Sequence, residues 1–180
     1  MKIIFPKRLV AIDPSHGPLF FLAGPARGGG DWQTRCCYEI EKNTKDFYAA
    51  IPYPPQTIHP LNPYREIGEE NHFERQLQWE RYYLDIAAIS GCIIFWLPCE
   101  STTNPRTGSD PYAMDTRGEL GEWRGCLRHN PNYHVVIGAE QGFPGLSQIQ
   151  RNFNAATKSD FPIYGSLGET VIAAIEKARQ

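Results

Sequence analysis

Two carboxylates stand where a chain of this type would build a catalytic site. Glu119 follows the apolar run 92–98 and lies in the segment 115–123, which is dense in charge and glycine. In open α/β sheets, ligands bind beyond the carboxyl ends of strands, where loops lead into helices. Asp85 is the only charged residue within 83–98. An apolar neighbourhood would raise its pKa into a range useful for proton transfer.

Glu119 also has a structural interpretation. Thr116-Arg117-Gly118-Glu119 matches a capping box, in which the threonine caps a helix and the glutamate bonds back to the N-cap amide. Gly118 and Gly121 flank Glu119, and each glycine inside a helix costs roughly 0.5–1 kcal/mol relative to alanine. That cost indicates that another group approaches this turn closely. From the residues alone, capping and ligand binding both remain open for Glu119.

Asp85 and Glu80 have structural alternatives as well. Asp85 could be hydrogen-bonded at the end of its helix instead of facing a cleft. Glu80 falls on the apolar stripe of the same predicted helix, and an ion pair with Arg75 or Arg81 or an interface contact is the favoured interpretation for it.

Composition restricts the class of partner. The 180 residues, 41% of them hydrophobic, fit one domain spanning 1–180, with 1–17 as an N-terminal arm or edge strand. A net charge of −2 does not favour binding to a nucleic-acid polymer or an anionic membrane surface, so a small ligand is expected. The longest apolar stretch, 86–98, is too short to cross a bilayer, and the N-terminus lacks a signal-peptide core, so we expect a cytoplasmic protein.

Metal and cofactor motifs are missing from the sequence. The five cysteines are odd in number and two are adjacent, which indicates free thiols. No CxxC, HxH or HxxxH spacing predicts a metal site. The glycine triplet 28–30 matches neither the dinucleotide-binding nor the P-loop pattern, and no GxSxG elbow occurs. We therefore expect neither a metal nor a cofactor, and chemistry carried by ordinary side chains.

Strands and helices are predicted to alternate along the chain, which is typical of an α/β fold with a mostly parallel sheet covered on both faces. The polar segment 98–114 is predicted to be a long loop before the helix that carries Glu119. The expected strands are 18–23, 56–59, 92–97, 133–138 and 161–164, and the other expected helices are 33–50, 71–90, 146–157 and 167–178.

Four motifs in this order carry a family resemblance over about residues 18–125. Together they resemble the nucleoside 2-deoxyribosyltransferase family. The resemblance implies a flavodoxin-like three-layer α/β sandwich with a central, mostly parallel sheet of about five strands. It also implies cleavage of the N-glycosidic bond of a 2′-deoxynucleoside and transfer of the sugar to another nucleobase. The motifs are Phe20-Phe21-Leu22-Ala23-Gly24-Pro25 with Asp31-Trp32, Trp79-Glu80 with Leu84-Asp85 and Ala88, Phe95-Trp96-Leu97-Pro98, and Arg117-Gly118-Glu119-Leu120-Gly121-Glu122-Trp123.

The resemblance assigns roles to individual residues. Glu119 matches the nucleophile that forms a covalent deoxyribosyl-enzyme, and Asp85 matches the aspartate that exchanges a proton with the nucleobase. Asp115 is the nearest match to the acidic residue that holds the sugar hydroxyls. A helix N-terminus would keep Glu119 ionised. Asn154 is the match for an asparagine that a neighbouring subunit contributes, so the resemblance implies a homo-oligomer.

The remaining candidates are substrate-binding residues. Phe20 stands where well-known family members have a tyrosine, so a hydroxyl contact is lost there. Trp32 either stacks on a nucleobase or packs locally, and Arg27 or Arg117 could bind a phosphate. The full substrate-binding set is Phe20, Gly24, Pro25, Asp31, Trp32, Asp115, Arg117, Glu122 and Asn154.

Two other functions compete with the transferase. A nucleoside or nucleotide N-glycosidase would use water as the acceptor of the sugar in place of a free nucleobase. A non-catalytic nucleotide-binding module would keep the cleft without turnover.

Overall fold

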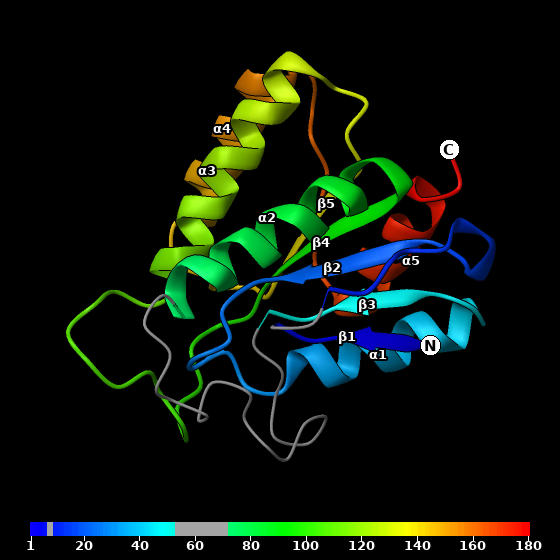
Figure 1. Ribbon diagram of the computed structural model, residues 1–180. Coiled ribbons are helices and arrows are strands. Elements are labelled where there is room, and N and C mark those ends of the chain that lie inside the picture. The colour runs from blue at the N-terminus through cyan, green and yellow to red at the C-terminus, as the bar shows by residue number, and fades with distance from the viewer. Residues whose placement is uncertain (7–8, 53–71) are drawn as a thin grey trace.

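A parallel β-sheet forms the centre of the protein (Figure 1). The computed structural model describes residues 1–6, 9–52 and 72–180. In this part of the chain the sheet has six strands, all parallel, in the order β1-β3-β2-β4-β5-β6. The strands are β1 (Lys2–Ile4), β2 (Leu19–Ala23), β3 (Tyr48–Ala50), β4 (Gly91–Leu97), β5 (Val135–Ala139) and β6 (Ile163–Tyr164).

The strand order is that of a flavodoxin-like sheet with one strand added at its edge. Without β1, the remaining five strands follow the flavodoxin order 2-1-3-4-5. The flavodoxin-like three-layer sandwich is thus confirmed, with six strands where about five were expected. Lys2–Ile4 provides the added edge strand and pairs with β3.

Helices cover both faces of the sheet (Figure 1). Side chains of β4 alternate between the two layers: Ile93 and Phe95 pack on one face, and Ile94 and Trp96 pack on the other. One face carries α2 (His72–Ser90), α3 (Met114–His129) and α4 (Leu146–Thr157), and the other carries α1 (Trp32–Asn43) and α5 (Leu167–Lys177). A short 3-10 helix at Pro14–His16 precedes β2.

One predicted helix is shorter than expected. The helix predicted over 33–50 ends at Asn43, and Tyr48–Ala50 forms β3 instead. This three-residue strand is buried because it pairs with β1 on one side and β2 on the other. The strand predicted at 56–59 lies outside the described residues.

The order of the strands determines where a ligand can bind. From β2 the chain passes through α1 to β3 on one side of the sheet, and it later returns to β4 on the other side of β2. At such a reversal, the loops after the two central strands leave in opposite directions and open a crevice. The loops that begin at Gly24 and Pro98 meet at this point.

None of the helices within the described ranges is long and apolar enough to cross a membrane.

Candidate active site

A cavity of about 130 Å³ lies at the crevice beyond β2 and β4. It is large enough for a small ligand or for one end of a larger one. Its walls come from the loop after β2 (24–27), Pro52, Gln76 and Glu80 on α2, Arg106 in the loop after β4, and the start of α3 (113–116) with Glu119.

Gly24 and Pro25 border this cavity, and Trp32 fixes their position. Gly24 has a φ of +153°, and a side chain there would collide with the Trp96 carbonyl oxygen and come within 2.8 Å of the Trp32 ring. Trp32 is fully buried, and its Nε1 donates a hydrogen bond of 2.9 Å to the Pro25 carbonyl oxygen. Of the two interpretations of Trp32, the structure shows local packing, because the ring supports the loop from below and leaves no face for a nucleobase.

Glu119 reaches the cavity from the second turn of α3. The helix begins at Met114, after Ala113 in the left-handed conformation (φ 60°), and no side chain caps it. Thr116 is a buried residue of the first turn, so it is not the N-cap. The capping-box interpretation is therefore wrong. Glu119 is half-buried and free to face a ligand.

The glycines beside Glu119 do not mark a close contact within the described chain. Gly118 and Gly121 are both exposed, and a Cβ built at either would meet nothing within 4 Å. The expectation that another group approaches this turn is not met by any described residue.

The carboxyl group of Glu119 is strongly perturbed. Burial raises its pKa to about 8, and the nearby charges of Glu80, Asp115 and Glu122 act in the same direction. The sequence led us to expect that a helix N-terminus keeps Glu119 ionised. That expectation is wrong, because Glu119 lies beyond the first turn, is largely buried and faces like charges.

Glu80 is the second carboxylate of the cavity, and the sequence interpretation missed it. The sequence favours an ion pair with Arg75 or Arg81 or an interface contact for Glu80. In the structure its carboxylate accepts a hydrogen bond of 2.8 Å from Gln76 Nε2, and the residue borders the cavity. Burial raises the pKa of Glu80, the Gln76 hydrogen bond lowers it and Asp115 raises it. A glutamate on the apolar stripe of a helix was the signal that could have identified it.

Asp85 lies away from the cavity. It is on α2, as expected, but its side chain is exposed and it is not among the residues that border the cavity. Its neighbour is Cys126 on α3, whose thiol pKa is raised by burial, by Glu122 and by Asp85. The predicted apolar neighbourhood of Asp85 is absent from the described residues.

Asp115 and Arg27 stand at the rim of the cavity. Arg27 Nη2 and Asp115 Oδ2 are 3.7 Å apart, and the two side chains are 61% and 80% exposed. A solvent-screened pair at this distance contributes little to stability. Both groups therefore remain accessible to a ligand.

Six of the nine predicted substrate-binding residues do not border the cavity: Phe20, Asp31, Trp32, Arg117, Glu122 and Asn154. Phe20 is fully buried on the opposite face of the sheet, where it packs against Phe47. Asp31 is exposed at the start of α1 and accepts a hydrogen bond from the Thr34 hydroxyl. Glu122 is exposed on α3 and acts on Glu119 only through its charge.

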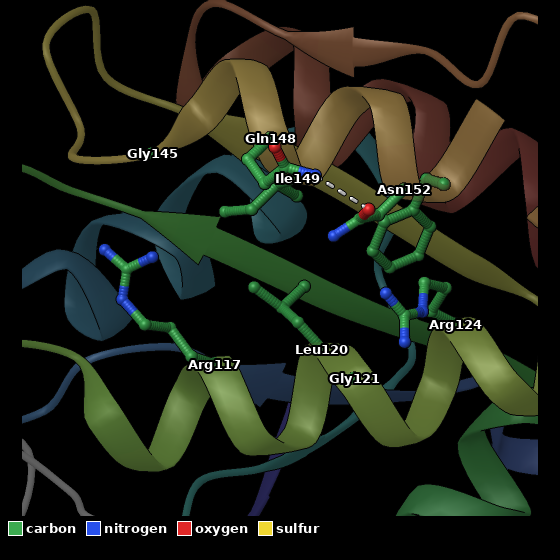
Figure 2. Close-up of a pocket in the computed structure, with 9 residues that line it drawn as sticks. Arg117, Leu120, Gly121, Arg124, Gly145, Gln148, Ile149 and Asn152 are labelled. Carbon is green, nitrogen blue, oxygen red and sulfur yellow. Dashed lines mark hydrogen bonds between the residues drawn. The ribbon is translucent and has the colours of Figure 1, made fainter. Parts of the chain in front are cut away.

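Arg117 faces a different part of the molecule. Its Nη2 donates a hydrogen bond of 2.7 Å to the Pro144 carbonyl oxygen, and its guanidinium lies over the Phe143 ring. Figure 2 shows Arg117, Leu120 and Gly121 of α3 facing Gln148 and Ile149 of α4 across a separate groove of about 350 Å³. Arg117 is thus unsuited to bind a ligand beside Glu119.

Asn154 has partners within its own chain. Its Oδ1 accepts hydrogen bonds from Gln150 Nε2 (2.8 Å) and from the Phe161 amide (3.0 Å), and its Nδ2 donates to Asp160 Oδ1 (3.2 Å). These bonds fasten the end of α4 to the segment that leads into β6. The contribution of Asn154 to a neighbouring subunit stays a prediction.

The polar side chains that line the cavity are carboxylates, arginines, one glutamine and one threonine. Across residues 1–6, 9–52 and 72–180, no group of three or more His, Cys, Asp or Glu side chains is arranged to hold a metal ion. No protein-family model matches this chain, and no curated protein matches its sequence.

Proposed function

We propose that this protein cleaves the N-glycosidic bond of a 2′-deoxynucleoside-type substrate and transfers the sugar to another nucleobase. The observation that carries the proposal is that Glu119 and Glu80, from two different helices, border one cavity at the crevice of the sheet. Paired carboxyl groups in one site are the catalytic groups of most enzymes that break glycosidic bonds through an oxocarbenium-like transition state. The ordered motifs around Glu119 support the same reaction.

The first half of the reaction forms a covalent glycosyl-enzyme. Ionised Glu119 attacks the anomeric carbon, the bond from that carbon to the base nitrogen breaks, and its electron pair leaves with the base. Protonated Glu80 donates its proton to the departing base, which makes the base a better leaving group. In the second half, a nitrogen of the incoming base attacks the anomeric carbon and displaces the Glu119 carboxylate, while its proton passes to Glu80. Each displacement inverts the configuration at the anomeric carbon, so the two together retain it.

The electrostatics of the cavity favour a state in which Glu80 and Glu119 together hold one proton. Burial and mutual repulsion oppose the ionisation of both groups, so the singly protonated form of the pair is favoured near neutral pH. Burial raises the pKa of Glu119 to about 8, which favours its protonated form, so the proposed attack requires this proton to pass to Glu80 first. Glu80 takes the proton-exchange role that the resemblance assigned to Asp85, because Glu80 borders the cavity and Asp85 does not.

Hydrolysis is the second candidate. It shares the first half of the reaction, and water replaces the incoming base in the second half. The exposure of Arg27 and Asp115 at the rim favours it, since solvent reaches that side of the cavity. Both reactions are proposed to act on small molecules of nucleoside metabolism in the cytoplasm.

Chromatography of the reaction products tests the proposal. The protein is incubated with each of the four common deoxynucleosides, with and without a different free base. Exchanged nucleoside in the presence of acceptor supports transfer, and free base with free sugar in its absence supports hydrolysis. If neither the nucleosides nor their 5′-monophosphates yield any product while a nucleoside still raises the melting temperature, the protein is a binding module and the proposal is wrong. Acid quenching and peptide mass mapping then identify which glutamate carries the sugar.

A further inference from the structure

Arg106 is a buried cation at the cavity wall. Its side chain is only 9% exposed. Nη1 donates a hydrogen bond of 3.0 Å to the Pro111 carbonyl oxygen, and Nη2 donates one of 3.1 Å to Asp110 Oδ2. Its Nε is buried and has no hydrogen-bond partner among the described residues. A buried donor without a partner destabilises the folded protein, because it has lost its hydrogen bond to water. A ligand oxygen that accepts a hydrogen bond from this Nε would remove that penalty.

The same cavity is bordered by the start of α3. The amides of Met114, Asp115 and Thr116 belong to the first turn of a 16-residue helix and have no partner within that helix. No side chain caps them, because the preceding residue is Ala113. The unpaired amides and the helix dipole together favour a negatively charged group at this end of a helix.

Arg27 adds a second cation to this end of the cavity. It comes from the loop after β2, and its nearest carboxylate, that of Asp115, is 3.7 Å away. That distance is too long for a strong charge-assisted hydrogen bond, so the guanidinium retains donors for a ligand. Two arginines and an uncapped helix start thus line a cavity that also contains the carboxylates of Glu80, Asp115 and Glu119.

We propose that the cavity binds a phosphate monoester, and that the substrate is a deoxynucleoside 5′-monophosphate in preference to the free nucleoside. Arg106, Arg27 and the first amides of α3 hold the phosphate, and the sugar lies between it and the two glutamates. Arginine guanidinium groups and helix N-termini are the groups that proteins use to recognise phosphate. This inference rests on the proposed function for the identity of the sugar and the base.

Binding measurements test the inference independently of turnover. Isothermal titration calorimetry on a Glu119→Gln variant compares a deoxynucleoside 5′-monophosphate with the corresponding deoxynucleoside, and inorganic phosphate serves as a competitor. We expect the monophosphate to bind roughly 10- to 100-fold more tightly, as for hydrogen bonds to a charged group. Inorganic phosphate should weaken binding of the monophosphate. Equal affinity for the two ligands would overturn the inference.

Arginine variants in the same background locate the phosphate site. Arg106→Gln and Arg27→Gln should each reduce the preference for the monophosphate by about tenfold, whereas Arg117→Gln, in the α3–α4 groove, should leave it unchanged. If the Arg106 variant does not fold, the Arg27 variant provides the test. The Arg27 side chain is exposed, so its replacement should not prevent folding. If the folded Arg106 and Arg27 variants keep the full preference for the monophosphate over the nucleoside, the proposed phosphate site is wrong. Wild-type protein that turns over neither ligand, yet prefers the monophosphate, disproves the reaction and leaves this inference standing.

Discussion

The carboxyl group of Glu80 on α2 disfavours the ionisation of Glu119 on α3, because both border the same cavity. The two residues are far apart in the sequence, and the helices that carry them pack on the same face of the sheet. Their juxtaposition provides a nucleophile and a proton carrier within one site.

Glu119→Gln should lower turnover roughly 10³-fold or more, because it removes the nucleophile while keeping the size of the side chain. The release of free base and the formation of exchanged nucleoside measure the effect by chromatography. Glu122→Gln is the matched control, since Glu122 is exposed on the same helix and does not border the cavity. An active Glu119→Gln variant would remove the basis of the proposed mechanism.

Glu80→Gln should reduce kcat by about 10²- to 10⁴-fold, the usual contribution of a general acid–base group. Asp85→Asn should retain nearly wild-type kcat, because Asp85 is exposed and lies outside the cavity. Steady-state kinetics on both variants distinguishes the two carboxylates. The opposite ranking would show that the resemblance places the proton-exchange residue correctly and that our assignment of Glu80 is wrong.

The raised pKa of Glu119 should make stability depend on pH. The folded protein holds this proton up to about pH 8, whereas the unfolded chain releases it near the ordinary glutamate pKa of 4.5. The folded state therefore binds more protons between these values, and the free energy of unfolding falls as pH rises through that window. Glu119→Gln removes this dependence, so the variant should be more stable than wild type by roughly 1–3 kcal/mol at pH 8.5.

Urea denaturation at several pH values measures this difference. The two proteins should have similar stability at pH 4, where Glu119 is protonated in both the folded and the unfolded state. A difference that is as large at pH 4 as at pH 8.5 would show that it has another cause than the proton on Glu119.

Trp32→Phe should destabilise the protein by about 1–2 kcal/mol more than Trp123→Phe. Both indoles are buried and both changes remove the same atoms, but only the Trp32 Nε1 donates to the Pro25 carbonyl oxygen. The Trp123 Nε1 has no hydrogen-bond partner in the described part of the chain. Urea denaturation of the two variants provides the comparison, and equal losses would mean that the bond to Pro25 contributes nothing.

Gly24→Ala and Gly118→Ala should change stability in opposite directions. At Gly24 a methyl group meets the Trp96 backbone and the Trp32 ring in a backbone conformation that favours glycine, so we expect a loss of about 2–4 kcal/mol. At Gly118 the space is open, and alanine in a helix should add about 0.5–1 kcal/mol. Thermal melting measures both. A destabilised Gly118→Ala variant would show that a group outside the described residues contacts this turn.

The sequence predicts the layers of this fold well, because its buried strands are continuous apolar runs. The runs at 18–23 and 92–97 correspond to β2 and β4 to within a residue or two. The three-residue strand β3 could not be told from the end of a helix, since its identity depends on pairing with β1 and β2. Local pattern alone does not contain such a long-range contact.

The site was only partly predictable for a geometric reason. Glu119, Asp115, Gly24 and Pro25 border the cavity as expected, because they follow strands whose carboxyl ends meet at one edge of the sheet. Glu80 and Asp85 are five residues apart on one helix, and therefore point about 140° apart around its axis. Which of them faces the cavity depends on how α2 is rotated against the sheet, and a single sequence does not fix that rotation.

The loop between β4 and α3 is closed at its base, where the Tyr112 hydroxyl donates a hydrogen bond of 2.8 Å to the Pro98 carbonyl oxygen. This bond joins the end of β4 to the residue just before Ala113, so the start of α3 is held whatever the length of chain between them. Within residues 99–111, Cys99 N donates to Glu140 Oε2 and Ser101 N donates to the Gly28 carbonyl oxygen, so the part of the loop that can be exchanged begins after Ser101 and includes Arg106. Grafting a different loop here offers a way to redesign the substrate preference of the protein while Glu119 keeps its place.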